Sequence, residues 1–328
     1  MSEALREAEH HHLTIAVDEA GERLDRVLAA RLGDLSRSRL KQLILAGAIR
    51  QNGGTISDPA LRVKPGQTFT IAVPQPRADR PPPQPMALDI RFEDQHLLVI
   101  DKPAGLVVHP APGNPDRTLV NALLAHCGET LAGIGGVRRP GIVHRLDKGT
   151  SGLMVAAKSE IAHAALSADF AAHRVRRAYL AVVWGVPLPR IGEIDGNIGR
   201  SRADRKKMAV VASGGKTART LYRVLREFGT GAALVECRLA TGRTHQIRVH
   251  LTERGHPLIG DPTYGGGQTS GRRRLVSVAV RQVAADLERP ALHAYQLGFQ
   301  HPVTGQSLDF TSELPNDITL LLNSLDLF

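Results

Sequence analysis

Proline density between residues 74 and 86 is the feature that most constrains how this chain can fold. The segment reads PQPRADRPPPQPM. Proline fixes φ and has no amide hydrogen, so such a run neither continues a helix nor pairs inside a sheet, and it is typical of an extended, semi-rigid spacer. We therefore predict a small domain over 13–73, a linker over 74–87 and a large domain over 88–328, with a disordered polar tail over 1–12.

Composition narrows the class of protein. The 328 residues carry a formal net charge of +10, and a basic chain usually meets a polyanion, with nucleic acid the first candidate and a membrane surface the second. No run of about 18 apolar residues occurs, so we expect no transmembrane helix. Cys127 and Cys237 are far apart, which argues against a disulfide scaffold or a zinc site and favours a reducing, cytoplasmic location.

Two helices followed by short strands are predicted in the small domain. Leucines recur at helical spacing in ERLDRVLAARL (22–32) and in DLSRSRLKQLILAGAI (34–49), and Gly47 ends the second helix. Glycine-containing turns at 52–54 and 64–66 separate the strands.

Three cations crowd the first turn of the second predicted helix: Arg37, Arg39 and Lys41. Positive charge at a helix N-terminus opposes the macrodipole and costs about 0.3–1 kcal/mol per residue. The run is either a solvated face or a set of phosphate contacts, and we predict that it binds RNA.

Strands and helices in the large domain do not follow a regular βαβ repeat. Strands are predicted over 96–101, 152–157, 179–185 and 233–242, and helices over 118–128 and 160–173, the latter with Ile161, Ala165, Leu166 and Phe170 on one face. Neither a GxGxxG nor a Walker motif is present, so a nucleotide cofactor is not indicated. The histidines lack the spacing of zinc ligands, so no metal site is predicted.

Two motifs combine charge with apolar flanks. In GIVHRLDKGTSGLM (141–154) buried charges require partners or a use, so the segment holds either a structural ion pair or chemistry. In ATGRTHQIRVHLTERG (240–255) a strand end leads into a helix whose first turns carry Arg243 and Arg248, and we predict that one of them serves an anion.

Tyr179 by itself suggests a core or interface residue. The loop 199–208 is either solvated or binds phosphate through Arg200, Arg202, Arg205, Lys206 and Lys207.

HRLDKGTSGLM closely resembles the signature of the RluA-type pseudouridine synthases. The resemblance extends through the large domain, in the family's order, over LLVIDKPAGLVVHP, RRAYLAVVWG, GRSRADRKKMAV, LVECRLATGRTHQIRVHL and GHPLIGDPTYGG. RLDRVLA, SRSRLKQLI and AIRQNGG resemble an S4 domain, a small RNA-binding module. Within the family several blocks look more like the RluD than the RluC subgroup. Gly149 is a departure, because the family commonly has an acidic residue there.

This resemblance implies an α+β fold with a largely antiparallel central mixed sheet flanked by helices, preceded by an S4 domain. It implies that Asp147 is the catalytic aspartate, that Tyr179 stacks on the target base and that Arg248 pairs with Asp147. It also implies that Arg145 enters the RNA and holds the flipped conformation. Asp261, in GDPTYGG, is interpreted simply as a turn residue.

The implied activity is isomerisation of uridine to pseudouridine in large-subunit ribosomal RNA, with the helix 69 stem-loop as the subgroup's target. Asp147 either attacks C1′ or removes the C2′ proton, and the sequence does not choose. Nothing is added or lost, so neither cofactor nor metal is expected, and a monomer without membrane or protein partners is predicted. The alternatives are a non-catalytic S4-type RNA-binding or ribosome-assembly protein and, more weakly, a nucleoside glycosidase, which would need a second carboxylate as general acid.

Overall fold

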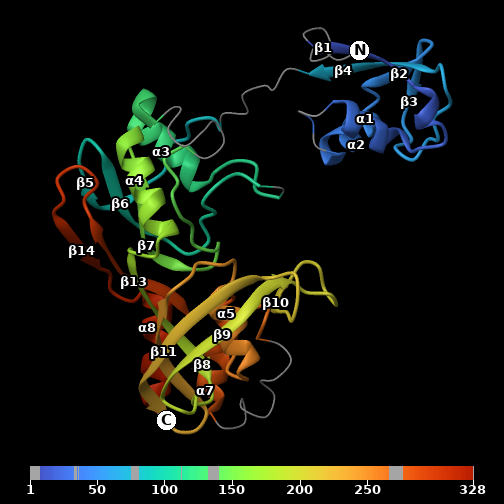
Figure 1. The fold of residues 1–328 in the computed structure, drawn as a ribbon. Helices are drawn as coiled ribbons and strands as arrows, with labels where there is room; N and C mark the ends of the chain where they lie inside the picture. Colours follow the sequence, from blue (N-terminus) through green and yellow to red (C-terminus); the bar gives the residue numbers. More distant parts are fainter. Residues whose placement is uncertain are drawn as a thin grey trace. The chain divides into compact units, whose positions relative to one another are not determined.

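The computed structural model describes residues 8–32, 35, 37–74, 81–111, 113–131, 140–265 and 276–327. The chain forms two compact units, residues 1–79 and 80–328 (Figure 1), which are described separately. Within the described ranges no helix is long and apolar enough to span a membrane.

The first unit is a four-stranded antiparallel sheet with two helices, in the strand order β1-β4-β2-β3. Its elements are β1 (Ala8–Thr14), a 3-10 turn (Val17–Glu19), α1 (Leu24–Arg31), α2 (Arg37–Leu45), β2 (Ile49–Gln51), β3 (Gly54–Ile56) and β4 (Thr68–Pro74). Leu28, Ile44 and Phe69 are fully buried between the helices and the sheet. Asn52 and Gly53 both have positive φ, which matches the two-residue turn expected between β2 and β3.

The predicted disordered tail is wrong for residues 8–12. These residues form β1, which pairs along the whole of β4, from Ala8 opposite Pro74 to Thr14 opposite Thr68. From His10 to Ile15 the side chains alternate between the exposed and the more buried side, and Leu13 and Ile15 enter the core. Alternation of apolar and polar residues is the sequence signal of a half-buried strand. Three consecutive histidines, 10–12, do not show this alternation, so the strand was not predicted. Residues 1–7 lie outside the described ranges.

The linker is also shorter than the predicted range of 74–87. Residues 75–80 lie outside the described ranges, but the stretch that follows is attached to the second unit. Asn121 donates through Nδ2 to the carbonyl of Pro82 at 2.8 Å, and its own carbonyl accepts from the Gln84 amide at 3.0 Å. A proline-rich segment satisfies few of its own hydrogen bonds, and here its remaining groups pair with the helix α3 (Leu119–Cys127) instead.

One ten-stranded sheet organises the second unit, in the order β10-β9-β11-β12-β8-β13-β7-β6-β5, with β14 paired to β13. The strands are β5 (Asp89–Glu93), β6 (Leu97–Lys102), β7 (Ser151–Ala157), β8 (Arg176–Trp184), β9 (Ile191–Arg200), β10 (Met208–Val210), β11 (Lys216–Phe228), β12 (Ala232–Leu239), β13 (Leu292–Gln300) and β14 (Ser307–Thr311). Only the β13–β7 pair is parallel among these named strands. The predicted largely antiparallel mixed sheet is therefore confirmed.

Helices cover this sheet. They are α3 (Leu119–Cys127), followed by a 3-10 turn (Gly128–Leu131), α4 (Glu160–Ala171), α5 (Gln246–Glu253), α7 (Val278–Asp286) and α8 (Asn316–Asp326). Figure 1 shows α4 beside β6 and β7, and α5 beside β9 and β10. The predicted buried face of α4 needs correction, because Ile161 is 64% exposed whereas Ala162 and Leu166 are buried against β7. Leu166 and Phe170 of the predicted face do pack in this core, so Ile161 is the misplaced member.

Gly152, at the start of β7, is required by close backbone packing. Its φ is +115°, and a Cβ built there would lie 2.3 Å from the carbonyl oxygen of Ala294 on β13. Only glycine allows both this φ and this approach. The contact fixes the start of β7 against β13, directly after the turn that carries Asp147.

Candidate active site

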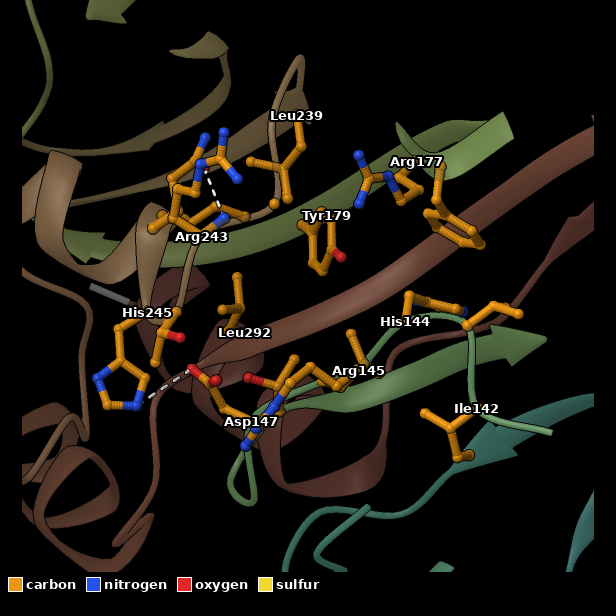
Figure 2. A pocket seen from close by; sticks show the side chains of 18 of the residues that line it. Ile142, His144, Arg145, Asp147, Arg177, Tyr179, Leu239, Arg243, His245 and Leu292 are labelled. Atoms are coloured by element: carbon orange, nitrogen blue, oxygen red, sulfur yellow. Dashed lines mark hydrogen bonds and ion pairs between the residues drawn. The ribbon is translucent and has the colours of Figure 1, made fainter. Parts of the chain in front are cut away.

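A cavity of about 650 Å³ opens where the two charged motifs meet. Its walls come from the segment before β7, the end of α4, the start of β8 and the turn between β12 and α5. Figure 2 shows Asp147, Tyr179 and His245 converging on this space from three different parts of the chain. The volume lies within the roughly 300–1,000 Å³ that small-molecule sites occupy.

Asp147 lies on a tight turn that is held from behind. Its carbonyl accepts from the Thr150 amide at 3.1 Å, and its side chain stays 18% exposed toward the cavity. The next carbonyl, of Lys148, accepts from the Gly105 amide at 2.8 Å and from Lys102 Nζ at 3.4 Å. Arg289 Nη1 donates to the carbonyl of Gly149 at 3.2 Å. Groups from distant segments therefore fix the backbone that aims Asp147.

Lys102 is the deepest of these supports. It is only 1% exposed, and its ammonium also donates to the carbonyls of Pro103 at 2.8 Å and Leu106 at 3.0 Å. Burial lowers the pKa of Lys102 to about 7, although the nearby Asp147 charge opposes this shift. The sequence of β6 predicts a buried apolar strand, but its last residue, Lys102, places a titratable amine behind the turn that carries Asp147.

Gly149 packs closely against the opposite segment. A Cβ at this position would lie 2.9 Å from Pro290 Cδ. Arg289, which holds the Gly149 carbonyl, is itself paired to both carboxylate oxygens of Asp317 at 2.6 Å. The departure at Gly149 therefore occurs in a turn that is fixed by hydrogen bonds and packing.

Arg248 bridges two carboxylates. From the first turn of α5, its Nη1 lies 3.2 Å from Asp147 Oδ2, while Nε and Nη2 bind the two oxygens of Asp261 at 2.7 and 2.9 Å. The guanidinium is almost completely buried and lies 4.9 Å from the centre of the Tyr264 ring. Burial opposes its charge, but the hydrogen bonds and charges of Asp261, and then of Asp147, raise the pKa of Arg248. The cavity therefore contains a fixed cation beside Asp147.

Asp261 is more than the turn residue that the sequence suggests. It does accept from the amides of Thr263 and Tyr264, at 2.9 and 3.1 Å, but its side chain is 0% exposed and makes the bidentate pair with Arg248. Local sequence patterns do not predict such an orienting carboxylate, because Asp261 lies 13 residues from Arg248 in the chain. Its signal in the sequence is only that a carboxylate sits among small residues in GDPTYGG.

His245, which follows the end of β12 as Arg243 does, is a second neighbour of Asp147. It caps α5 in a left-handed conformation, with φ 58° and ψ 22°. Its Nε2 lies 3.8 Å from Asp147 Oδ2, and its Nδ1 lies 2.8 Å from the Tyr264 hydroxyl. Burial lowers the pKa of His245, an effect that Asp147 opposes. Non-glycine residues in this conformation are strained and gather at functional sites.

Tyr179 projects its ring into the cavity from β8, as Figure 2 shows. It is 6% exposed and also belongs to the main apolar core. Tyr179 is therefore a core residue, as its sequence suggests, and it lines the cavity as well. Burial raises the pKa of Tyr179, which keeps the hydroxyl protonated at neutral pH. The ring is therefore a rigid, neutral face across the cavity from Asp147.

His144 and Arg145, which precede Asp147 in the segment 141–154, have separate environments. His144 accepts from the Val155 amide at 3.1 Å and stacks on Phe170 with ring centres 4.4 Å apart. Burial lowers the pKa of His144 to about 3, so it is a neutral structural acceptor. Arg145 is exposed at the cavity, with Nη1 3.2 Å from His109 Nε2.

The predicted RNA-binding residues lie on two different units. Lys41 is exposed on α2, and α2 begins at Arg37, but the side chains of Arg37 and Arg39 lie outside the described parts of the chain. Arg200 is the last residue of β9, and the turn from there to β10 carries Arg202, Arg205, Lys206 and Lys207. That turn ends at the Met208 amide, which donates to Tyr264 at 2.9 Å. The basic turn is thus tied to the ring beside His245 and Arg248.

Comparison with known proteins defines the class. Residues 96–253 match the family model for RNA pseudouridylate synthases, and residues 22–69 match that for the S4 domain. A protein of Zymomonas mobilis named ribosomal large subunit pseudouridine synthase D is 50% identical over 315 residues, which are 95% of this chain and 96% of that protein. The chain belongs to the RNA pseudouridine synthase family, and its first unit carries an S4 domain.

Further relatives agree with this assignment. A protein with the same name in Neisseria meningitidis serogroup B is 47% identical over 96% of this chain and 82% of its own length. Among solved structures, the human RNA pseudouridylate synthase domain containing 4 is 28% identical, with a TM-score of 0.56, over 72% of this chain and 92% of that one. The family resemblance read from the sequence is confirmed.

Proposed function

We propose that this protein isomerises uridine to pseudouridine in large-subunit ribosomal RNA, with Asp147 as the catalytic carboxylate. The observation that carries the proposal is the pair formed by Asp147 and Arg248 at 3.2 Å, inside a cavity faced by Tyr179. A buried cation stabilises and orients a neighbouring carboxylate in a partly dry pocket, and such a carboxylate acts as a nucleophile or a base. The names of the relatives point to the same RNA class.

The reaction conserves every atom of the substrate. The target uridine leaves the stack, at a cost of a few kcal/mol that phosphate contacts and pocket stacking offset. The bond from N1 to C1′ breaks, the uracil turns within the cavity, and C5 bonds to C1′. C5 loses its proton and N1 gains one, either by transfer of the same proton or by exchange with solvent. Asp147 either attacks C1′ and is later displaced, or removes the C2′ proton and returns it. Tyr179 stacks on the base, and Arg145 enters the RNA to hold the flipped conformation.

RNA binding is shared between the S4 unit and the catalytic unit in this proposal. The basic turn 200–207 and the cations of α2 contact phosphates, which fix position without reading sequence. By the subgroup resemblance the target is the helix 69 stem-loop, and a ribosomal substrate implies the cytoplasm. A purely RNA-binding role is less compatible with the site, because an ionised carboxylate in an RNA-facing cavity would repel phosphate.

The test is to incubate the full chain with a helix 69 transcript and with unmodified large ribosomal subunits, and to locate pseudouridine by primer extension after carbodiimide treatment. We expect conversion of uridines in the loop of helix 69, and none in a scrambled transcript of equal length. Tight binding to both substrates without any conversion would favour the RNA-binding alternative instead.

A further inference from the structure

A second cavity, of about 680 Å³, adjoins the active site. Its walls include His173, Asp195, Asn197, Thr217, Arg219 and Thr241. Four of these lie on neighbouring strands, with Thr217 opposite Asn197 and Arg219 opposite Asp195 across the β9–β11 pair. Side chains alternate along a strand, so these four lie on the same face of the sheet. We call this cavity the β9–β11 groove.

The groove lies on the outward face of this strand pair. Ile198 and Ala218, on the other face, pack against Val249 of α5. The groove face instead carries exposed polar side chains, among them Asp195, Thr217 and Arg219, while Asn197 is half-buried. The strand pair that supports α5 and Arg248 thus presents a polar recess to solvent on its opposite side.

The chemistry of the groove suits a neutral group with both donors and acceptors. Asn197 and Thr217 each offer both, and the Asp195 carboxylate offers acceptors only. The positive charge of Arg219 is already opposed by Glu193, at 2.5 Å. A phosphate would meet the Asp195 charge, whereas the edge of a nucleobase would find partners of both kinds. Single-stranded RNA is read through such base edges.

The groove is continuous with the active site at two points. His173, two residues beyond the end of α4 and with a positive φ of 59°, lines both cavities. Arg243 lines the active-site cavity, and its Nε donates at 3.0 Å to the carbonyl of Thr217 in the groove. His173 and Arg243 therefore mark the boundary between the two cavities, where the phosphate between two successive nucleotides would lie.

We propose that the β9–β11 groove binds the base of an unpaired nucleotide next to the target uridine, and that Asn197 is a specificity-determining residue for it. This inference rests on the proposed function, because it assigns a second subsite for the same RNA. With this subsite, the enzyme selects its uridine by the neighbouring nucleotide, which must be unpaired and carry a suitable base, as well as by the uridine itself.

The test uses helix 69 transcripts in which each nucleotide within three positions of the target is replaced, one at a time, by an abasic nucleotide. Affinity and kcat/KM are measured for wild type, for Asn197→Ala and for the control Asn323→Ala, an exposed position on α8. For wild type and the control, we expect one flanking position at which loss of the base lowers affinity and kcat/KM about tenfold. For Asn197→Ala, the intact transcript should already show this loss, and the abasic change there should add nothing.

The proposal is overturned if wild type is indifferent to every flanking base, or if Asn197→Ala loses the same factor on every transcript. Turnover of the intact transcript by wild type tests the proposed function separately. If turnover is absent, the affinities alone still decide whether the groove binds a base.

Discussion

Replacing Arg248 with methionine is expected to lower kcat/KM by about two to three orders of magnitude and to destabilise the protein by about 3–5 kcal/mol. The activity falls because Asp147 loses the guanidinium 3.2 Å away, which orients its carboxylate and neutralises its charge within the cavity. The stability falls because Asp261, whose side chain is 0% exposed, becomes an uncompensated buried charge. Urea unfolding and single-turnover assays measure the two effects independently.

Two further variants separate stability from catalysis. Adding Asp261→Asn to Arg248→Met removes the buried unpaired charge, so we expect most of the stability to return while the activity stays low. Arg248→Lys keeps a charge but cannot form the bidentate pair with Asp261, and it should be intermediate in both properties. Recovery of activity together with stability in the double variant would contradict a direct role for Arg248 at Asp147.

Replacing Lys102 with methionine is expected to lower kcat by about 10- to 100-fold with little change in KM. Lys102 holds the carbonyl of Lys148, and methionine fills similar space without a donor, so the turn that aims Asp147 is released. A displacement of about 1 Å at a reacting group costs on the order of a hundredfold in rate. An unchanged kcat would show that the Gly105 and Arg289 contacts suffice to hold the turn.

The same variant gives a pH signature. The pKa of Lys102 is lowered by burial from 10.5 to about 7, so between these values the unfolded chain binds a proton that the folded protein does not. Stability therefore rises with pH across this window, by at most about 1.4 kcal/mol per pH unit. Groups common to both proteins cancel in the difference. The free energy of unfolding of wild type minus that of Lys102→Met should thus increase from pH 7 to pH 9, and a constant difference would contradict the assigned pKa.

Much of the fold could be predicted because the relevant signals are local. The strand over 96–101 appears as β6, and the helix over 118–128 appears as α3, ended by Gly128 with a positive φ. The turn at Asn52 and Gly53 and the stop at Gly47 also follow from residue chemistry at single positions. The exposure of Ile161 was mispredicted because alanines occur on the exposed as well as the buried side of α4, so its amphipathic signal is weak.

The site was predictable where its residues fall inside a recognisable motif and not where they act across the fold. The Asp147 and Arg248 segments stand out because charge interrupts apolar sequence. Asp261 and Lys102 do not, because their roles depend on burial and on partners far away in the chain. The strand β1 was missed for the same reason, since only its pairing with β4 shows that it is ordered.

The central claim is that the Asp147 carboxylate performs the chemistry, and the most direct test is pseudouridine formation by Asp147→Asn on the helix 69 transcript. Asparagine keeps the shape of the side chain but removes the charge that a nucleophile or base requires. We expect no detectable pseudouridine from this variant, with RNA affinity close to that of wild type. Asp286→Asn, at an exposed position on α7, should convert the transcript like wild type. Substantial conversion by Asp147→Asn would contradict the assignment of Asp147 as the catalytic carboxylate.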